Sequence, residues 1–162
     1  MQIYFASDHA GFELKNALVD YARSLGHTAE DCGAEKFDAD DDYPELIARA
    51  ARKLSSDEKA GRESRAVVIG ASGQGEAIVA NRFKGVRCAL YYGPAGRSQT
   101  DMGGKKFDIL ASTREHNNAN ALSLGARFIT VPEAKEVLKK WLEISFSGGE
   151  RHARRVRQID EV

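Results

Sequence analysis

The chain has 162 residues, of which 42% are hydrophobic and 30% are charged, and its acidic and basic residues balance to a formal net charge of zero. This length suffices for one domain with a full hydrophobic core, and the composition is that of a globular, soluble protein. No apolar run approaches the roughly 18 residues of a membrane span, so we expect no membrane partner. The N-terminus has no basic region followed by an apolar stretch, and we therefore expect no secretion signal and a cytoplasmic location.

Strands and helices are predicted to alternate along the chain. Strands are expected at residues 2–6, 28–32, 65–69, 86–92 and 127–131. Helices are expected at residues 12–25, 44–54, 77–81, 117–124, 133–144 and about 149–160. This alternation predicts βαβ units, and hence an α/β fold of the Rossmann-like three-layer α/β/α kind around a five-stranded parallel sheet.

The whole chain, 1–162, is predicted to form a single domain. Gly148-Gly149 breaks the chain before a basic C-terminal helix at about 149–160. Two segments, 55–64 and 93–107, are predicted to be unusually long loops, and such loops often serve as lids or subunit contacts.

Charge is unevenly distributed along the sequence. Residues 1–58 carry 13 acidic and 6 basic side chains, whereas residues 59–162 carry 11 acidic and 18 basic ones. The acidic run Asp38-Ala39-Asp40-Asp41-Asp42 is interpreted as a solvated loop. The densest basic segment, 151–157, has no interleaved aromatic residues, so we favour a local anion site or a solvated helix face over a nucleic-acid patch.

The most informative segment is the turn Gly70-Ala71-Ser72-Gly73-Gln74-Gly75-Glu76, which follows an apolar strand and leads into a helix. A glycine-rich turn of this kind presents backbone N–H groups at the positive end of a helix dipole, where an anion can bind. The spacing differs from the dinucleotide pattern, and the lysine of a P-loop is absent. A tight turn without function is therefore an open alternative. Ser72 and Glu76 add a hydroxyl and a proton acceptor to it.

Polar side chains also follow the first predicted strand, in Ser7-Asp8-His9-Ala10-Gly11. Ligands bind beyond the carboxyl ends of parallel strands, so we expect Asp8 and His9 to lie beside the glycine-rich turn. Asp8 could equally serve as a helix N-cap. A second imidazole, His116, lies in the polar segment 113–120, whose alternative interpretation is a helix start with Thr113 as N-cap.

Six ordered segments along nearly the whole chain resemble ribose-5-phosphate isomerase type B, a family that includes the galactose-6-phosphate isomerase subunits. The segments are 7–11, 42–44, 70–76 with Ala80-Asn81, 114–117, 124–127 and 148–152. The resemblance implies an aldose–ketose isomerase that acts on a sugar phosphate through an enediolate, without metal or cofactor. Interconversion of ribose 5-phosphate and ribulose 5-phosphate leads, and a hexose 6-phosphate is an alternative substrate. The alternative outside enzymes is a non-catalytic phosphosugar- or nucleotide-binding protein.

The resemblance also implies the identity of the base. Many members carry a cysteine at the place of Gly70, and neither Cys32 nor Cys88 matches that place. The chain resembles instead the subgroup in which a glutamate, here Glu76, removes the proton beside a serine hydroxyl, here Ser72. Desolvation would raise the pKa of this glutamate and a helix N-terminus would lower it, and the sequence leaves open which prevails.

Further roles follow from the same resemblance. His116 would open the sugar ring with help from Asp8. The substrate would be bound by Asp8, His9, Tyr43, Ser72, Gly73, Gly75 and Asn117. Its phosphate would be bound by His9, Arg127, Arg151 and Arg155, the last two of which lie one helical turn apart. The family builds its sites between subunits, so a homodimer or a tetramer with shared active sites is expected.

Overall fold

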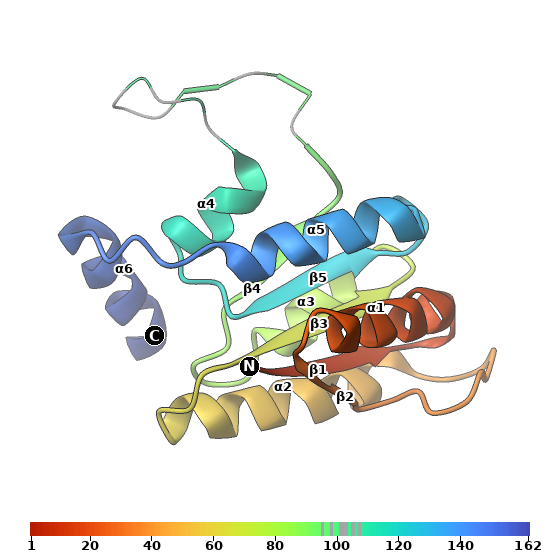
Figure 1. Cartoon of the computed structure of the whole chain (residues 1–162). Coiled ribbons are helices and arrows are strands. Elements are labelled where there is room, and N and C mark those ends of the chain that lie inside the picture. Colours follow the sequence, from red (N-terminus) through yellow and green to blue (C-terminus); the bar gives the residue numbers. More distant parts are fainter. Residues whose placement is uncertain (95, 98, 101–103, 105, 107) are drawn as a thin grey trace.

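A five-stranded parallel sheet forms the middle layer of the molecule (Figure 1). Its strands are β1 (Gln2–Ser7), β2 (Thr28–Asp31), β3 (Ser64–Gly70), β4 (Cys88–Tyr91) and β5 (Ala121–Gly125). They lie in the order β2-β1-β3-β5-β4, and each neighbouring pair is parallel. The computed structural model describes residues 1–162 except 95, 98, 101–103, 105 and 107.

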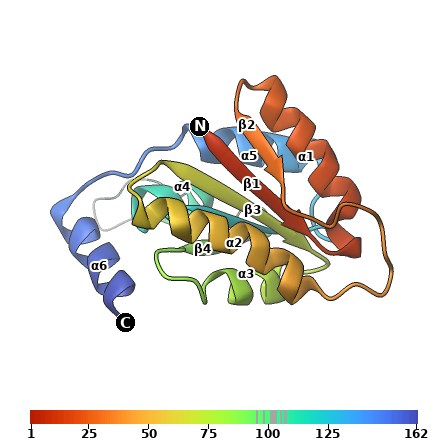
Figure 2. The ribbon, with the colours of Figure 1, turned by 90° about the horizontal axis from the view of Figure 1, so that it is seen from below.

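Helices cover both faces of the sheet, which confirms the predicted Rossmann-like three-layer fold (Figure 2). They are the short 3-10 helix η1 (His9–Gly11), α1 (Phe12–Ser24), α2 (Tyr43–Lys59), α3 (Gln74–Ala80), α4 (Ile109–Glu115), α5 (Val131–Glu143) and α6 (Glu150–Glu161). One face is covered by α1 and α5, and the other by α2 and α3. Within the described residues, no helix is both long and apolar enough to span a membrane.

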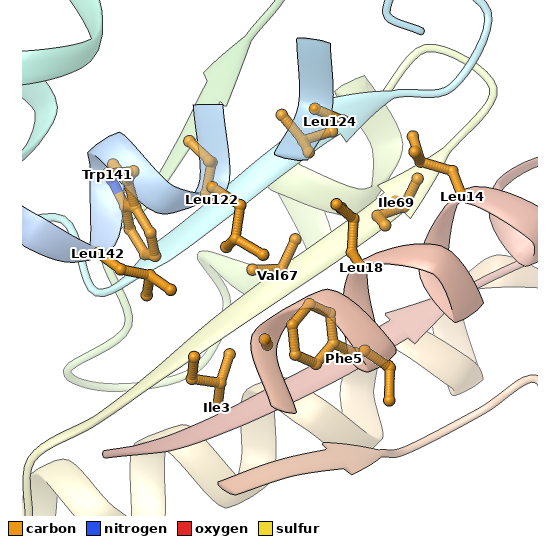
Figure 3. Packing of buried hydrophobic residues seen from close by; sticks show 14 of the residues in the cluster. Ile3, Phe5, Leu14, Leu18, Val67, Ile69, Leu122, Leu124, Trp141 and Leu142 are labelled. Atoms are coloured by element: carbon orange, nitrogen blue, oxygen red, sulfur yellow. The ribbon is translucent and has the colours of Figure 1, made fainter. Parts of the chain in front are cut away.

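Side chains that alternate along the strands build two separate cores. On the face that α1 and α5 cover, Phe5, Val67 and Leu122 pack with Leu18 and Trp141 (Figure 3). On the opposite face, the intervening residues of β1 and β3 pack against α2 and α3. Because both faces are buried, the strands are apolar along most of their length, and polar groups are left for the strand ends.

The order of helix and strand after residue 108 differs from the prediction. Residues 121–125 form β5 rather than part of a helix, and α4 ends before them. The predicted fifth strand at 127–131 is mostly a turn, and Thr130 caps the following helix α5 through a capping box with Glu133. The error has a physical reason, because a short apolar run fits a buried strand and a buried helix segment equally well.

The predicted loop at 55–64 is wrong, since α2 occupies its first half and only residues 60–63 separate that helix from β3. The buried Asp57 explains why the polar end of α2 stays helical. Its carboxylate accepts hydrogen bonds from the Tyr4 hydroxyl at 2.7 Å and from the Arg62 side chain. Tyr4 is 53 positions away, so no local pattern indicates this contact.

The other predicted loop, 93–107, includes all seven residues that lie outside the described set, so its length is tested only in part. Gly93, two residues after the end of β4, has a φ of +134°, a backbone conformation that favours glycine. Further along, Thr100 and Lys106 form an isolated antiparallel bridge.

Candidate active site

The turn between β3 and α3 depends on glycine, as its sequence indicates. Gly73 has a φ of +75°, and a Cβ on it would approach the backbone of Leu124 to 2.9 Å. Glycine alone combines this conformation with so close an approach. The Ser72 hydroxyl accepts a hydrogen bond from the N–H of Gln74 at 3.4 Å. The turn thus brings Ser72 and Glu76 to the carboxyl edge of the sheet.

Glu76 is the buried acid of this turn, with 4% of its surface exposed. Burial raises the pKa of its carboxyl above the usual value, a hydrogen bond with its own backbone opposes this rise, and the charge of Asp8 adds to it. In the protein without substrate, burial outweighs this opposing hydrogen bond. A general base works best with a pKa near the ambient pH, so this shift suits Glu76 to proton abstraction.

The Glu76 carboxylate fills the space beside Gly70, the last residue of β3. A Cβ placed on Gly70 would overlap the carboxylate carbon and Oε1 of Glu76. The site can therefore hold a side chain at position 70 or this orientation of the glutamate, but not both. Steric exclusion therefore accounts for glycine at position 70, where the resemblance implies a cysteine in many related proteins, when a glutamate ends the turn.

Two more predicted residues lie against the turn. Asp8 accepts a hydrogen bond from the N–H of Gly11 at 3.2 Å and so caps η1. It also lies close enough to Glu76 for its charge to raise the pKa of that carboxyl. The Tyr43 ring covers the turn, since a Cβ on Gly75 would approach it to 2.7 Å. Asp8 therefore combines the structural role with a place beside the base.

His9 and Arg127 bring positive charge to the same edge. Nδ1 of His9 lies 2.7 Å from Oδ1 of Asp41, and this hydrogen bond is the largest cause of a raised pKa at His9. Arg127 is near enough for its charge to lower that pKa. The interpretation of residues 38–42 as a solvated loop is wrong for Asp41, whose side chain is 12% exposed. No local pattern singles out Asp41, because its partner lies 32 positions away.

The remaining predicted residues form a second group, on α4 and α6. The His116 ring stacks on that of His152, with centroids 4.4 Å apart and planes inclined by 4°. Burial lowers the pKa of His152, and the charges of Arg155 and Arg151 contribute to this shift. Asn117 follows His116 directly. Sequence reasoning missed His152, although it belongs to one of the six ordered segments.

The alternative interpretation of residues 113–120, a helix that starts with Thr113 as its N-cap and contains His116, is wrong. Asp108 is the N-cap, and its Oδ1 accepts hydrogen bonds from the N–H groups of Leu110 and Ala111 at 3.0 Å. Thr113 lies inside the helix, and His116 is its C-cap. His116 is therefore presented at the end of α4 that faces α6.

The two groups lie at opposite edges of the sheet. Asp8, Glu76 and Arg127 follow the carboxyl ends of three strands, whereas His116 and Asn117 precede the amino end of β5. The strands are parallel, and at about 3.3 Å per residue the length of β5 separates the groups by roughly 13 Å or more. Figure 1 shows α6 at the amino ends of the strands, away from the turn between β5 and α5. One copy of the chain does not bring all predicted residues together.

One cluster among the described residues has the composition of a metal site. Potential ligand atoms of Asp8, His9 and Asp41 lie within 4.8 Å of one another. However, Nδ1 of His9 is engaged by Asp41, and Oδ1 of Asp8 caps η1. A cation would have to break these bonds and face the charge of Arg127. We therefore assign the three residues to a helix cap and an ion pair rather than to a metal.

Known proteins of one family are similar to this chain over nearly its whole length. The family model described as Ribose/Galactose Isomerase matches residues 3–100 and 106–159. Ribose-5-phosphate isomerase B of Mycobacterium tuberculosis (strain ATCC 25618 / H37Rv) is 39% identical over 156 residues, which cover 96% of this chain and 86% of that protein. The putative sugar phosphate isomerase YwlF of Bacillus subtilis is 34% identical over 161 residues, 99% of this chain and 96% of that protein.

A solved structure is similar over the same length. Ribose-5-phosphate isomerase B from Mycoplasma genitalium with bound ribulose-5-phosphate superimposes with a TM-score of 0.83 at 32% sequence identity, covering 99% of this chain and 94% of that chain.

Gly70→Ala tests the exclusion between position 70 and Glu76. The added methyl group should displace the carboxylate and lower turnover of ribose 5-phosphate by roughly 10- to 100-fold, because small misplacements of a reacting group are costly. Gly96→Ala is the matched control, since none of the residues that the structure describes lies within 4 Å of a Cβ at that position. Equal turnover of both variants in a steady-state assay would contradict the exclusion.

Thiol chemistry should play no part in the reaction. Burial raises the pKa of both Cys32 and Cys88 to about 12, so that very little thiolate exists near neutral pH. The Cys32→Ala/Cys88→Ala protein should keep turnover within about twofold, and the wild type should resist iodoacetamide. Loss of activity in step with alkylation of one thiol would show the opposite.

Proposed function

The chain belongs to the ribose/galactose isomerase family, and from this membership we infer that it is an aldose–ketose isomerase of a pentose phosphate. One observation supports this most directly: the buried Glu76 carboxylate occupies the space beside Gly70, in the turn that anions and sugar oxygens can approach. The names of the relatives favour ribose 5-phosphate over a hexose 6-phosphate. A purely binding module would need no such buried base.

The reaction that we propose is a proton transfer between neighbouring carbon atoms. After His116 opens the sugar ring with help from Asp8, Glu76 removes the proton from C2 of the aldose. The enediolate that forms is stabilised by hydrogen bonds from Asn117 and from the turn that contains Ser72. A proton passes from O2 to O1 of the enediolate, and Glu76 returns the proton that it removed from C2 to C1, which yields the ketose and restores the carboxylate.

The active site is proposed to form between two copies of the chain. The carboxyl edge of one protomer carries Glu76 and Asp8, and the opposite edge of the sheet carries His116. A dimer in which these edges face each other would complete the site with His116 of the partner subunit. Arg151 and Arg155 on α6 would then reach the phosphate across the interface, where His9 and Arg127 already supply charge.

The dimer, any larger assembly and a cytoplasmic location stay predictions, and membership in a family of metabolic enzymes supports the location. The activity itself is tested with purified protein, ribose 5-phosphate and a chelator, without added cofactor. Ribulose 5-phosphate should appear, and hexose 6-phosphates should react much more slowly. The absence of ribulose 5-phosphate would contradict the proposed function.

Glu76→Gln tests the base. The amide keeps the shape of the side chain but accepts no proton, so kcat should fall by about 100-fold or more while KM changes little. In the wild type, kcat should rise with pH through the raised pKa of Glu76, because the base acts only when deprotonated. The measurement is the pH dependence of kcat in both proteins. Near-normal turnover of Glu76→Gln would assign the base elsewhere.

Mixing two inactive variants tests the shared site. Glu76→Gln and His116→Asn should each be nearly inactive, and after subunit exchange activity should return to about one quarter of the wild type, since half of the dimers are mixed and each keeps one intact site. A mixture of Glu76→Gln with Asp8→Asn is the control, because both changes lie on the same edge and restore nothing. Failure of the first mixture, with exchange shown by tagged subunits, would place the whole site within one chain.

A further inference from the structure

We propose that Asp41 is a positioning residue for His9, which fixes the tautomer of the imidazole and keeps the ring cationic, so that Nε2 can donate to the substrate phosphate. This inference rests on the proposed function, in which His9 binds that phosphate. It adds to the site a residue that lies outside the six ordered segments of the sequence.

A single carboxylate oxygen holds His9 at two points. Oδ1 of Asp41 accepts a hydrogen bond from the backbone N–H of His9 at 3.1 Å and lies 2.7 Å from Nδ1 of the ring. Phe37, from the same loop, meets the His9 ring edge-on, with ring centroids 6.4 Å apart and planes at 86°. Together these contacts fix both the backbone and the ring, and they leave Nε2 as the nitrogen that can face a ligand.

The bond to Asp41 also decides which nitrogen of His9 carries a proton. A carboxylate accepts hydrogen bonds and does not donate them, so a neutral ring must be protonated on Nδ1. In that tautomer Nε2 is an acceptor, and its lone pair would repel the oxygens of a phosphate. Only the doubly protonated ring can donate from Nε2. Phosphate binding by His9 therefore depends on the charge of the ring.

Charges on three segments act on this ring. Asp41, before α2, and Asp8, before η1, favour the cation, whereas Arg127, in the turn after β5, and desolvation oppose it. The pKa of His9 is raised overall, and the hydrogen bond with Asp41 is the largest cause. The Asp41 side chain is 12% exposed against 34% for His9, so solvent screens the carboxylate only weakly.

The second carboxylate oxygen of Asp41, Oδ2, gives a further reason for a cation at His9. Oδ2 is buried and has no hydrogen-bond partner within the part of the chain that the structure describes. A carboxylate that loses water without gaining hydrogen bonds is destabilised unless a cation lies beside it. The protonated ring of His9 supplies that cation, and so the pair favours the charged form of His9.

Asp41→Asn tests the proposal, because the amide keeps an acceptor for Nδ1 but removes the charge. The His9 ring, followed by NMR, should titrate at lower pH than in the wild type. At pH 8, KM for ribose 5-phosphate should rise by about 3- to 10-fold while kcat stays within about twofold. Near pH 6, where more of the His9 ring is protonated than at pH 8, the ratio of the two KM values should be smaller than at pH 8.

The controls separate charge at His9 from loss of structure. Asp40→Asn removes the same charge from an exposed neighbour in the same loop and should keep the wild-type KM at both pH values. Asp41→Glu keeps the charge and should retain most of the wild-type pH dependence. Comparing ratios to the wild type cancels the titration of the substrate phosphate, whose second pKa is about 6.

The outcomes for Asp41 and for the proposed function are distinguishable. A wild type without isomerase activity would overturn the function, whereas the ring titration of His9 needs no turnover and still tests Asp41. A KM ratio that is the same at pH 6 and pH 8, or a His9 titration that Asp41→Asn leaves unchanged, would overturn the role of Asp41. If that variant does not fold, a wild-type His9 that titrates below the usual histidine value would overturn it as well.

Discussion

The burial of both faces of the parallel sheet constrains the rest of this molecule. Side chains of the strands point alternately into two apolar cores, so the strand interiors leave little room for a reacting group. Polar chemistry is confined to the strand ends, and parallel strands have two different ends. One receives the glycine-rich turn with Glu76, and the other receives the α4–β5 connection with His116. The site shared between two copies that we propose would follow directly from this separation.

Two buried arginines hold the amino-end edge in place. Arg65, at the start of β3, donates hydrogen bonds to the carbonyls of Trp141 and Leu142 at 2.8 and 3.0 Å, and Arg114 of α4 donates to that of Ile144 at 3.1 Å. They meet the carboxyl end of α5, where the helix dipole favours cations. Burial, with the charge of Arg114, lowers the pKa of Arg65 to about 10. Through Arg114, α4 is attached to the end of α5, which determines where His116 lies.

The carboxyl edge combines two electrostatic requirements. A general base needs a raised pKa, and a phosphate site needs positive charge. Burial is the main cause of the pKa shift at Glu76, and the hydrogen bond that His9 donates to Asp41 is the main cause at His9. Asp8 contributes to both shifts in the same direction. The Asp8 carboxylate, which caps η1, therefore also favours the protonated forms of Glu76 and His9.

Local patterns in the sequence suffice for the α/β fold, for most elements up to β4, and for the carboxyl-edge residues Asp8, Ser72 and Glu76. These features depend on residues that are close in sequence: an alternation of strands and helices, and polar groups that directly follow a strand. The length of α2 and the position of β5 require tertiary contacts, because a short apolar run is compatible with either secondary structure. The separation of His116 from Glu76 follows from the direction of β5, and the pairing of His9 with Asp41 joins residues 32 positions apart. Packing alone sets such contacts, since no short stretch of sequence contains both partners.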